Sequence, residues 1–411
     1  MSEILSNCFE KVNKKEEILK ESFKCLNCKK KYCVFGCPIE IDIPKFIAHI
    51  KNNNLELAHE IIKEKNLFPS ICSRVCPVEK QCESMCIKNK LSNPVSISRL
   101  EKYVADLFLN NNINKIDNKL NKKICVVGSG PSGLACALKL AQYNYEVNLY
   151  EKFDFLGGVL AYGIPEFRLP KDILNKEIEK VRNLGVRFNT NIEIGKDLSL
   201  KDLFKLGNNA VYISTGAEQS KLLNIPGENF SEVYPANVFL RKINIEKNCF
   251  NFKIYVIIGG GNVAIDSARC AKKLGNNHVT IMYRKSEQNL CANRSEILNA
   301  KKENIDFIFE SIPTKILGNN KVEFIEYLKN NKQVYKLQTD CVVFAIGSKP
   351  NDLIKTIERT ENNLIITKNS QTSQKGVYAG GDVVTGPSTV VSAIKFGMQS
   401  AKQIHLDLQK M

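Results

Sequence analysis

The stretch KICVVGSGPSGLACALKL, residues 123–140, decides the fold of this 411-residue chain. An apolar run at 124–127 leads directly into Gly128, Gly130 and Gly133, and a helical apolar pattern follows. In this G-x-G-x-x-G spacing the first glycine permits a tight turn, the second lets the backbone approach a pyrophosphate, and the third lets helix and strand pack closely. The helix N-terminus would add a positive dipole for phosphates, and Pro131 and Ser132 are predicted cofactor contacts there. The stretch therefore predicts a strand, a turn and a helix that bind a dinucleotide.

The next β-like run, EVNLYEK at 146–152, contains Glu151. An acidic residue at about this distance from the glycines meets a ribose hydroxyl in dinucleotide-binding domains. A glycine turn without a ligand is the poorer alternative.

The stretch KIYVIIGGGNVAIDSARCAKKL, residues 253–274, repeats this pattern with Gly259, Gly261 and Ala264, and predicts further cofactor contacts at Asn262 and Val263. Its second strand ends in Arg284 and Lys285 instead of an acid. A guanidinium can accept a 2′-phosphate through charge-assisted hydrogen bonds, whereas a carboxylate would repel it. The second loop therefore favours NADP over NAD. The alternative is that both cations are solvated surface charges.

Composition places the chain among ordinary soluble globular proteins, with 43% apolar and 25% charged residues. The net charge of +16 could suit nucleic acid or an acidic partner, but the lysines are spread along the whole chain. We expect no nucleic-acid binding, because no basic stripe carries regularly placed aromatics. No signal-peptide core or membrane-length apolar run occurs, which predicts a cytoplasmic location and no membrane contact. The fifteen cysteines should then be thiols or metal ligands.

Nine of those cysteines precede residue 90. The stretch CLNCKKKYCVFGCP, residues 25–38, is similar to the ferredoxin run C-x2-C-x2-C-x3-C-P, with two extra residues before the third cysteine. A second group comprises Cys72, Cys76, Cys82 and Cys86. A zinc ribbon is the alternative, but zinc needs only four ligands. Eight thiolates and the dinucleotide loops favour two 4Fe–4S clusters.

The remaining cysteines form no redox pair in the sequence. Cys125, Cys136, Cys270, Cys291 and Cys341 are single residues in apolar or helical runs, and we expect them to be buried structural thiols. Cys249 stands alone before the second glycine loop, and Cys8 is expected to be unrelated to the clusters. Electrons taken from a dinucleotide would therefore leave by way of the N-terminal cysteines.

A third element lies at 377–401, VYAGGDVVTGPSTVVSAIKFGMQSA, where a strand ends near Gly381 and Asp382. Here the chain resembles flavoprotein oxidoreductases with two dinucleotide-binding domains. The resemblance implies that Asp382 binds the flavin ribityl chain and that the helix starting near Thr389 and Val390 faces the isoalloxazine. The segments ISTGA (213–217) and FAIGSKP (344–350) resemble the crossings between the two domains, with cofactor contacts at Thr215, Gly216 and Gly347.

Over nearly its full length the chain resembles the NADPH oxidoreductases of the glutamate synthase small-subunit type. This group includes the flavin and iron–sulfur subunit of NADH-dependent ferredoxin:NADP oxidoreductase and the N-terminal half of dihydropyrimidine dehydrogenase. The matching stretches include CLNCKKKYCVFGCPIEIDIPKFI, NLFPSICSRVCPVEKQCESMC and LGGVLAYGIPEFRLPK. The last of these implies cofactor contacts at Gly157, Gly158, Tyr162 and Arg168. The segment NLCANRSEI departs from the family, which usually has Met-Pro before its Ala.

The resemblance implies an α/β fold in three parts. A helical domain at 1–120 would bind two 4Fe–4S clusters, an FAD domain would comprise 121–218 and 344–411, and an NADP domain at 219–343 would be inserted into it. One cluster would be held by Cys25, Cys28, Cys33 and Cys86, and the other by Cys37, Cys76, Cys82 and Glu101. Without the resemblance, Glu101 reads as a solvated helix glutamate. Cys72 would be a spare thiol.

The function implied is electron transfer in a hetero-oligomer. NADPH would deliver hydride to FAD, and the clusters would exchange electrons with a partner, either a glutamate synthase large subunit or a ferredoxin or flavoprotein subunit. No side chain need act as an acid or base, because catalysis is positioning. One alternative is a bifurcating subunit that exchanges electrons among NADPH, NADH and ferredoxin. Another is a non-enzymatic metal-binding or nucleic-acid-binding module.

Overall fold

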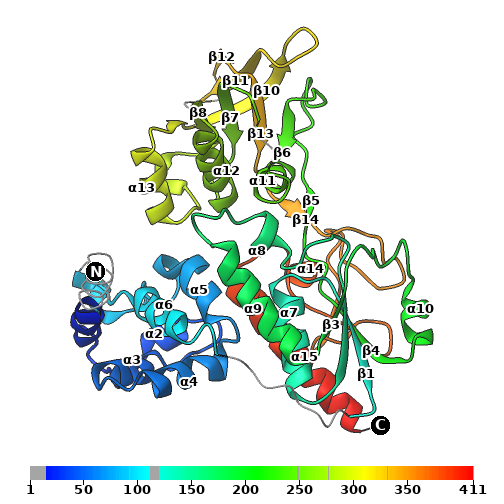
Figure 1. Cartoon of the computed structure of the whole chain (residues 1–411). Coiled ribbons are helices and arrows are strands. Elements are labelled where there is room, and N and C mark those ends of the chain that lie inside the picture. The colour runs from blue at the N-terminus through cyan, green and yellow to red at the C-terminus, as the bar shows by residue number, and fades with distance from the viewer. Residues whose placement is uncertain are drawn as a thin grey trace, which may run out of the picture.

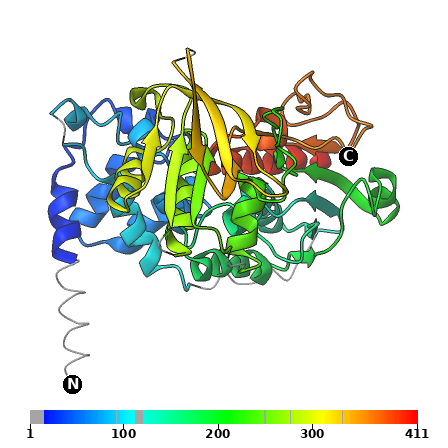
Figure 2. The same cartoon turned by 90° about the horizontal axis from the view of Figure 1, so that it is seen from above.

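The computed structural model describes residues 15–91, 93–111, 120–247, 250–275, 277–330 and 332–410. Cys8 and Cys249 lie outside these ranges. Figure 1 shows three parts: helices at the N-terminus, an α/β unit that contains the C-terminus, and a second α/β unit above both. Viewed from above, the second unit lies over the boundary between the other two (Figure 2). This arrangement confirms the expected fold class. No helix within the described ranges is both long and apolar enough to cross a membrane.

The N-terminal part consists of short helices joined by cysteine-bearing loops. The helices are α2 (Tyr32–Phe35), α3 (Ile43–Lys51), α4 (Leu55–Lys65), α5 (Pro69–Val75) and α6 (Ile97–Leu107), with 3-10 turns η1 (Val78–Lys80) and η2 (Ile87–Leu91). Asp42 and Asn54 cap α3 and α4 by accepting hydrogen bonds from the backbone N–H groups of Lys45 and Leu57. Such caps satisfy amide groups that a helix leaves unpaired at its start.

The first α/β unit is a parallel sheet in the order β15-β4-β1-β2-β3. Its strands are β1 (Lys123–Val127), β2 (Glu146–Tyr150), β3 (Arg187–Asn189), β4 (Asn208–Ile213) and β15 (Val377–Ala379). Helices α7 (Pro131–Gln142) and α15 (Val390–Gln409) pack against each other. They approach closely at Gly397, where a Cβ atom would overlap the carbonyl oxygen of Ser132. The start of α7 is thereby fixed beside the start of α15.

The second unit is inserted between β4 and β15 of the first. Its parallel sheet has the order β6-β13-β7-β8-β9, with β6 (Val233–Pro235), β7 (Ile254–Ile258), β8 (His278–Met282), β9 (Asp306–Ile308) and β13 (Cys341–Phe344). An antiparallel sheet adds β10 (Ser311–Leu317), β11 (Phe324–Lys329) and β12 (Gln333–Gln338). The two crossings run side by side, because β5 (Gln219–Ser220) pairs with β14 (Ser348–Lys349).

The remaining helices cover the sheets and connect the units. They are α8 (Val159–Tyr162), α9 (Lys171–Asn183), α10 (Leu200–Lys205), α11 (Ala236–Asn244), α12 (Asn262–Lys273), α13 (Arg294–Lys302) and α14 (Asp382–Thr385), with the turn η3 (Glu287–Asn289). One hydrophobic core runs from Phe46 and Leu100 of the N-terminal part to Leu174 of α9 and Ile404 of α15. The cysteine-bearing part is therefore packed onto the first α/β unit.

Candidate functional site

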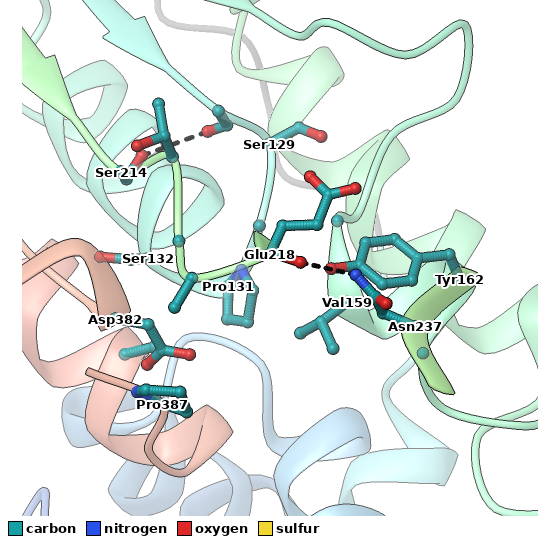
Figure 3. A pocket seen from close by; sticks show the side chains of 18 of the residues that line it. Ser129, Pro131, Ser132, Val159, Tyr162, Ser214, Glu218, Asn237, Asp382 and Pro387 are labelled. Atoms are coloured by element: carbon teal, nitrogen blue, oxygen red, sulfur yellow. Dashed lines mark hydrogen bonds between the residues drawn. The ribbon is translucent and has the colours of Figure 1, made fainter. Parts of the chain in front are cut away.

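A cavity of about 340 Å³ lies where the three parts of the molecule meet. The N-terminal part contributes Val75 and Pro77, and the second unit contributes Asn262 and Val263. Figure 3 shows Ser132, Asp382 and Pro387 on one side of it and Val159, Tyr162 and Asn237 on the other. The cavity is lined by fifteen of the predicted cofactor residues: Gly128, Gly130, Pro131, Ser132, Glu151, Gly158, Tyr162, Arg168, Thr215, Gly216, Asn262, Val263, Asp382, Thr389 and Val390.

Nine predicted cofactor residues do not line this cavity. They are Gly133, Gly157, Gly259, Gly261, Ala264, Arg284, Lys285, Gly347 and Gly381. Gly133 has the packing role expected of a third glycine, since a Cβ atom there would overlap the carbonyl oxygen of Gly128. Gly381 lies directly behind the wall, because its Cβ atom would come within 2.8 Å of Ser132 Cβ.

The first glycine loop has the shape that its sequence predicts. Gly128 has a φ of +96°, and a Cβ atom there would lie 2.6 Å from the carbonyl oxygen of Ser214. No atom comes within 4 Å of a Cβ position at Gly130, so the backbone faces open space. That space fits the close approach of a pyrophosphate at the start of α7.

Glu151 is buried and holds this loop through Ser129. Its Oε2 accepts hydrogen bonds from Ser129 N–H at 2.9 Å and from Ser129 Oγ at 2.6 Å. Ser129 Oγ in turn accepts a hydrogen bond from the backbone N–H of Gly157 at 3.0 Å. Gly157 therefore acts through Ser129 instead of lining the cavity. Ser129 was not predicted, because the glycine motif accepts any residue at this position.

The opposite wall is formed by the ends of α14 and α15. Burial raises the pKa of Asp382 to about 6, although its carboxylate accepts a hydrogen bond from the backbone N–H of Ser388 at 3.3 Å. Thr389 caps α15 by accepting a hydrogen bond from Ser392 N–H. The carboxylate therefore has capacity for a hydroxyl donor, and the start of α15 presents positive dipole charge to the cavity.

The second glycine loop is open in the same way. Gly259 has a φ of +145°, with Ala345 O 2.5 Å from its Cβ position, whereas nothing lies within 4 Å of the Cβ position of Gly261. β8 ends at Met282, and the exposed Arg284 and Lys285 follow it after Tyr283 instead of ending the strand. The segment that departs from the family packs onto the loop, since Cys291 and Ala292 donate backbone hydrogen bonds to Gly260 O.

A contact from the N-terminal part reaches this same segment. The Glu79 carboxylate accepts hydrogen bonds from the backbone N–H groups of Arg294 at 2.8 Å and Ser295 at 3.1 Å, at the start of α13. Lys80 Nζ donates to Cys291 O at 2.6 Å. Glu79 lies between Cys76 and Cys82 in the sequence. This contact was not predicted, because adjacent Glu and Lys residues between two cysteines are typical of a solvent-exposed turn.

Arg168 lines the cavity, but its guanidinium is already paired and connects the two α/β units. Its guanidinium forms an ion pair with Asp266 at 2.6 Å, and both side chains are buried. Burial raises the pKa of Asp266 to about 6, and the Arg168 charge opposes that rise. The pair holds the start of α9 against α12, which carries the second glycine loop.

The first predicted cysteine set converges on a small cavity of its own. Cys25, Cys28, Cys33 and Cys86 all line it, and its floor is apolar. The pKa of the Cys33 thiol is raised to about 12, first by burial and then by the neighbouring Cys25 and Cys86 sulfurs. The structure therefore brings together four thiols separated by up to sixty-one residues.

The second set is more deeply buried. Burial and the nearby Glu101 raise the pKa of Cys37 and Cys82, while the pKa of Cys76 is raised by a hydrogen bond with Cys72, by burial and by Glu101. Cys72 therefore lies among this set instead of apart from it. No three His, Cys, Asp or Glu side chains in the described ranges converge closely enough to hold a single metal ion.

Glu101 belongs to this second set by position. It lies on α6, is 9% exposed, and accepts a hydrogen bond from Asn66 Nδ2 at 2.9 Å. Burial raises the pKa of its carboxyl to about 7. The alternative of a solvated helix glutamate is therefore wrong. Asn66, which orients the carboxylate, was missed because nothing in the sequence links it to a cysteine.

Comparison with known proteins agrees with this geometry. A family model described as pyridine nucleotide-disulphide oxidoreductase matches residues 122–397. The chain belongs to this oxidoreductase family. A second model, dihydropyrimidine dehydrogenase domain II with a 4Fe-4S cluster, matches residues 5–113.

Curated relatives cover nearly all of this oxidoreductase. It is 34% identical to the NAD-dependent dihydropyrimidine dehydrogenase subunit PreT of Escherichia coli K12, across 94% of this chain and 93% of the relative. It is 29% identical to the glutamate synthase [NADPH] small chain of Azospirillum brasilense, across 95% and 89%. These relatives confirm the family resemblance drawn from the sequence.

Solved structures support the fold of the oxidoreductase. FprA of Mycobacterium tuberculosis in complex with NADPH has a TM-score of 0.62 at 18% identity, covering 70% of this chain and 85% of that one. Thioredoxin reductase of Lactococcus lactis has a TM-score of 0.59 at 23% identity, covering 71% and 100%.

The family implies FAD, NAD(P) and a 4Fe–4S cluster, and the residues present fit all three. Open space in front of Gly130 and Gly261 suits two dinucleotides. The thiol-rich sets suit iron–sulfur ligation. No cysteine lines the large cavity within the described ranges.

The single cysteines of the oxidoreductase bear out the prediction of buried thiols at Cys125, Cys136, Cys270 and Cys341. The prediction is wrong for Cys291, which is exposed. Cys291 follows the turn η3 on a surface loop, and the apolar residues around it in the sequence do not form a strand or helix there.

Proposed function

We propose that this oxidoreductase uses NADPH and FAD to exchange electrons with a partner protein through two 4Fe–4S clusters. The observation that carries the proposal is the position of Val75 and Pro77. These residues flank Cys76 in the sequence and also line the cavity of the first glycine loop. The buried cysteine set and the flavin cavity thus have a wall in common.

The chain's own residues act by binding and orienting. Gly130 and the start of α7 would hold the FAD pyrophosphate, and Asp382 would accept a hydrogen bond from the ribityl chain. Gly261 and the start of α12 would hold the second dinucleotide. When bound, FAD converts the two-electron chemistry of NADPH into single electrons. Cys37, Cys76, Cys82 and Glu101 would hold the cluster nearer the cavity, and Cys25, Cys28, Cys33 and Cys86 the one nearer the surface.

Three finer assignments belong to this proposal. NADPH is favoured because Arg284 and Lys285 are exposed just beyond the end of β8, where a 2′-phosphate would lie. A hetero-oligomer is favoured because the relatives are named a subunit and a small chain. A reducing cytoplasm is favoured because no two of the described cysteines form a disulfide.

Anaerobic mixing with NADPH tests the proposal. The purified full-length protein should be brown, and its flavin absorbance should bleach on adding NADPH. A colourless protein that contains zinc would contradict the proposal.

Arg284→Ala tests the choice of nucleotide. Loss of the guanidinium should raise the KM for NADPH by about tenfold or more, from a lost charge-assisted hydrogen bond of about 1.5–3 kcal/mol, with little change for NADH. Lys315→Ala, at an exposed position on β10, is the control. Equal effects of Arg284→Ala on both nucleotides would defeat the assignment.

A further inference from the structure

The cavity of the first cysteine set opens among exposed apolar side chains. Leu26, Tyr32, Met85 and Ile87 line it together with the four thiols. Phe35 does not line the cavity but is exposed next to Gly36, whose Cβ position lies 2.8 Å from Met85 Cγ. Leu26 is 63% and Phe35 is 76% exposed. We call these five residues the mouth patch. Apolar groups concentrated in this way mark interaction surfaces, whereas singly scattered ones do not.

Positive charge surrounds the mouth patch. Six lysines and no acidic residue occur within segments 22–39 and 84–91, which carry the patch. Lys24 and Lys31 pair with Glu21 and Asp42. In the described ranges the other four form no ion pair: Lys29, Lys30, Lys88 and Lys90. Their positive charge is therefore free to attract an external group.

Glu83 lies directly before the second segment and does not offset this charge, whereas the exposed Glu40 directly follows the first segment. Glu83 accepts hydrogen bonds from the backbone N–H and the hydroxyl of Ser98, each at 2.9 Å. Its carboxylate therefore faces α6. The surface around Cys25, Cys28, Cys33 and Cys86 thus combines an apolar centre with a rim of cations.

We propose that the mouth patch docks a redox protein whose own docking face is acidic and surrounds its electron-accepting centre. The inference rests on the proposed function and names the class of partner. Complementary charge speeds encounter at low salt and orients the two faces, and the apolar centre excludes water. One NADPH gives two electrons, so two one-electron acceptors are reduced while NADP⁺ and one proton are released.

The test uses the full-length holoprotein under anaerobic conditions, with NADPH as donor. An acidic flavodoxin is the one-electron acceptor, and basic cytochrome c is the acceptor of opposite charge. Lys29→Glu/Lys30→Glu/Lys88→Glu reverses the rim. Lys315→Glu/Lys332→Glu/Lys336→Glu makes the same charge change at exposed positions in the second unit.

The rim variant should lower kcat/KM for flavodoxin by about tenfold or more at low ionic strength, and the control by about twofold or less. The difference should shrink above about 0.5 M salt, and kcat/KM for cytochrome c should rise. Leu26→Ser/Phe35→Ser should lower kcat/KM for flavodoxin without changing its salt dependence. Iron content is measured for every variant, so that lost clusters are not read as lost docking.

Equal effects of the two lysine variants would overturn the inference. So would rim-dependent binding of a single-stranded oligonucleotide or of anionic phospholipid vesicles with flavodoxin turnover unaffected, or a dimer in sedimentation that Leu26→Ser/Phe35→Ser dissociates. Bleaching of the flavin by NADPH is recorded in parallel. If bleaching fails in the wild type, the proposed function fails; if it succeeds without a rim effect, only the docking inference fails.

Discussion

The two cysteine sets differ in burial and in what surrounds them. In the buried set, Cys37 and Cys82 are 8% and 9% exposed, Cys76 is partly exposed, and the buried Glu101 lies near them. In the surface set all four thiols are partly exposed and open onto the mouth patch. The buried set adjoins the flavin cavity through Val75 and Pro77. Because ligand type, solvent exposure and hydrogen bonds set cluster potentials, the two sets should differ in potential as well as in position.

Removing one thiol from either set should cause the largest change, a loss of iron. Cys33→Ser and Cys82→Ser should each lose about half of the iron, because each would dismantle one of two 4Fe–4S clusters. Cys33→Ser should keep its FAD and its bleaching by NADPH but lose transfer to protein acceptors. Iron and labile-sulfide analysis with electron paramagnetic resonance checks this. Cys72→Ser is the control and should keep its iron. An unchanged iron content in Cys33→Ser would contradict the assignment of a cluster to the surface set.

Substitutions of Glu101 test whether its carboxylate completes the buried set. Glu101→Ala removes the carboxylate oxygens that could bind iron. It also leaves the buried Asn66 amide without its hydrogen-bond partner, which should lower the free energy of unfolding by about 1–3 kcal/mol. Its thermal stability should fall and the spectrum of one cluster should change. Glu101→Gln keeps one side-chain oxygen that could bind iron, so its thermal stability and cluster spectrum should be much closer to those of the wild type.

Cys72 provides the counter-test. If Glu101→Ala keeps all of its iron and Cys72→Ser loses about half of it, then the thiol, and not the carboxylate, completes the buried set.

The smallest effect is expected at Glu79, which joins the buried set to the second unit. Glu79→Gln weakens two hydrogen bonds at the start of α13, worth about 0.5–1.5 kcal/mol together. The KM for NADPH should rise by about two- to tenfold, while iron and FAD content stay constant. Glu361→Gln, at an exposed position on a loop, is the control. A change in iron content without a change in KM would show that the contact serves the cluster alone.

Much of the site could be predicted, because its determinants are local. Gly128 and Gly259 follow buried strands directly, so the positions of both dinucleotide loops follow from the sequence. The grouping of Cys37 with Cys76 and Cys82 followed only from the family resemblance, because ligand spacing does not fix pairing.

What could not be predicted depends on contacts distant in sequence. Each of these contacts is a hydrogen bond between distant residues. Ser129 donates to Glu151, Asn66 donates to Glu101, and Glu79 accepts from the start of α13. The mouth patch was not predicted, because the lysines around it do not stand out in a chain with a net charge of +16. Only folding shows that they surround four thiols.

The most direct test of the central claim, two separate clusters in two distinct cysteine sets, is the iron and acid-labile sulfide content per FAD of the anaerobically purified chain. We predict about eight iron atoms and about eight sulfides per FAD, as two 4Fe–4S clusters require. About four of each, or zinc without sulfide, would contradict it.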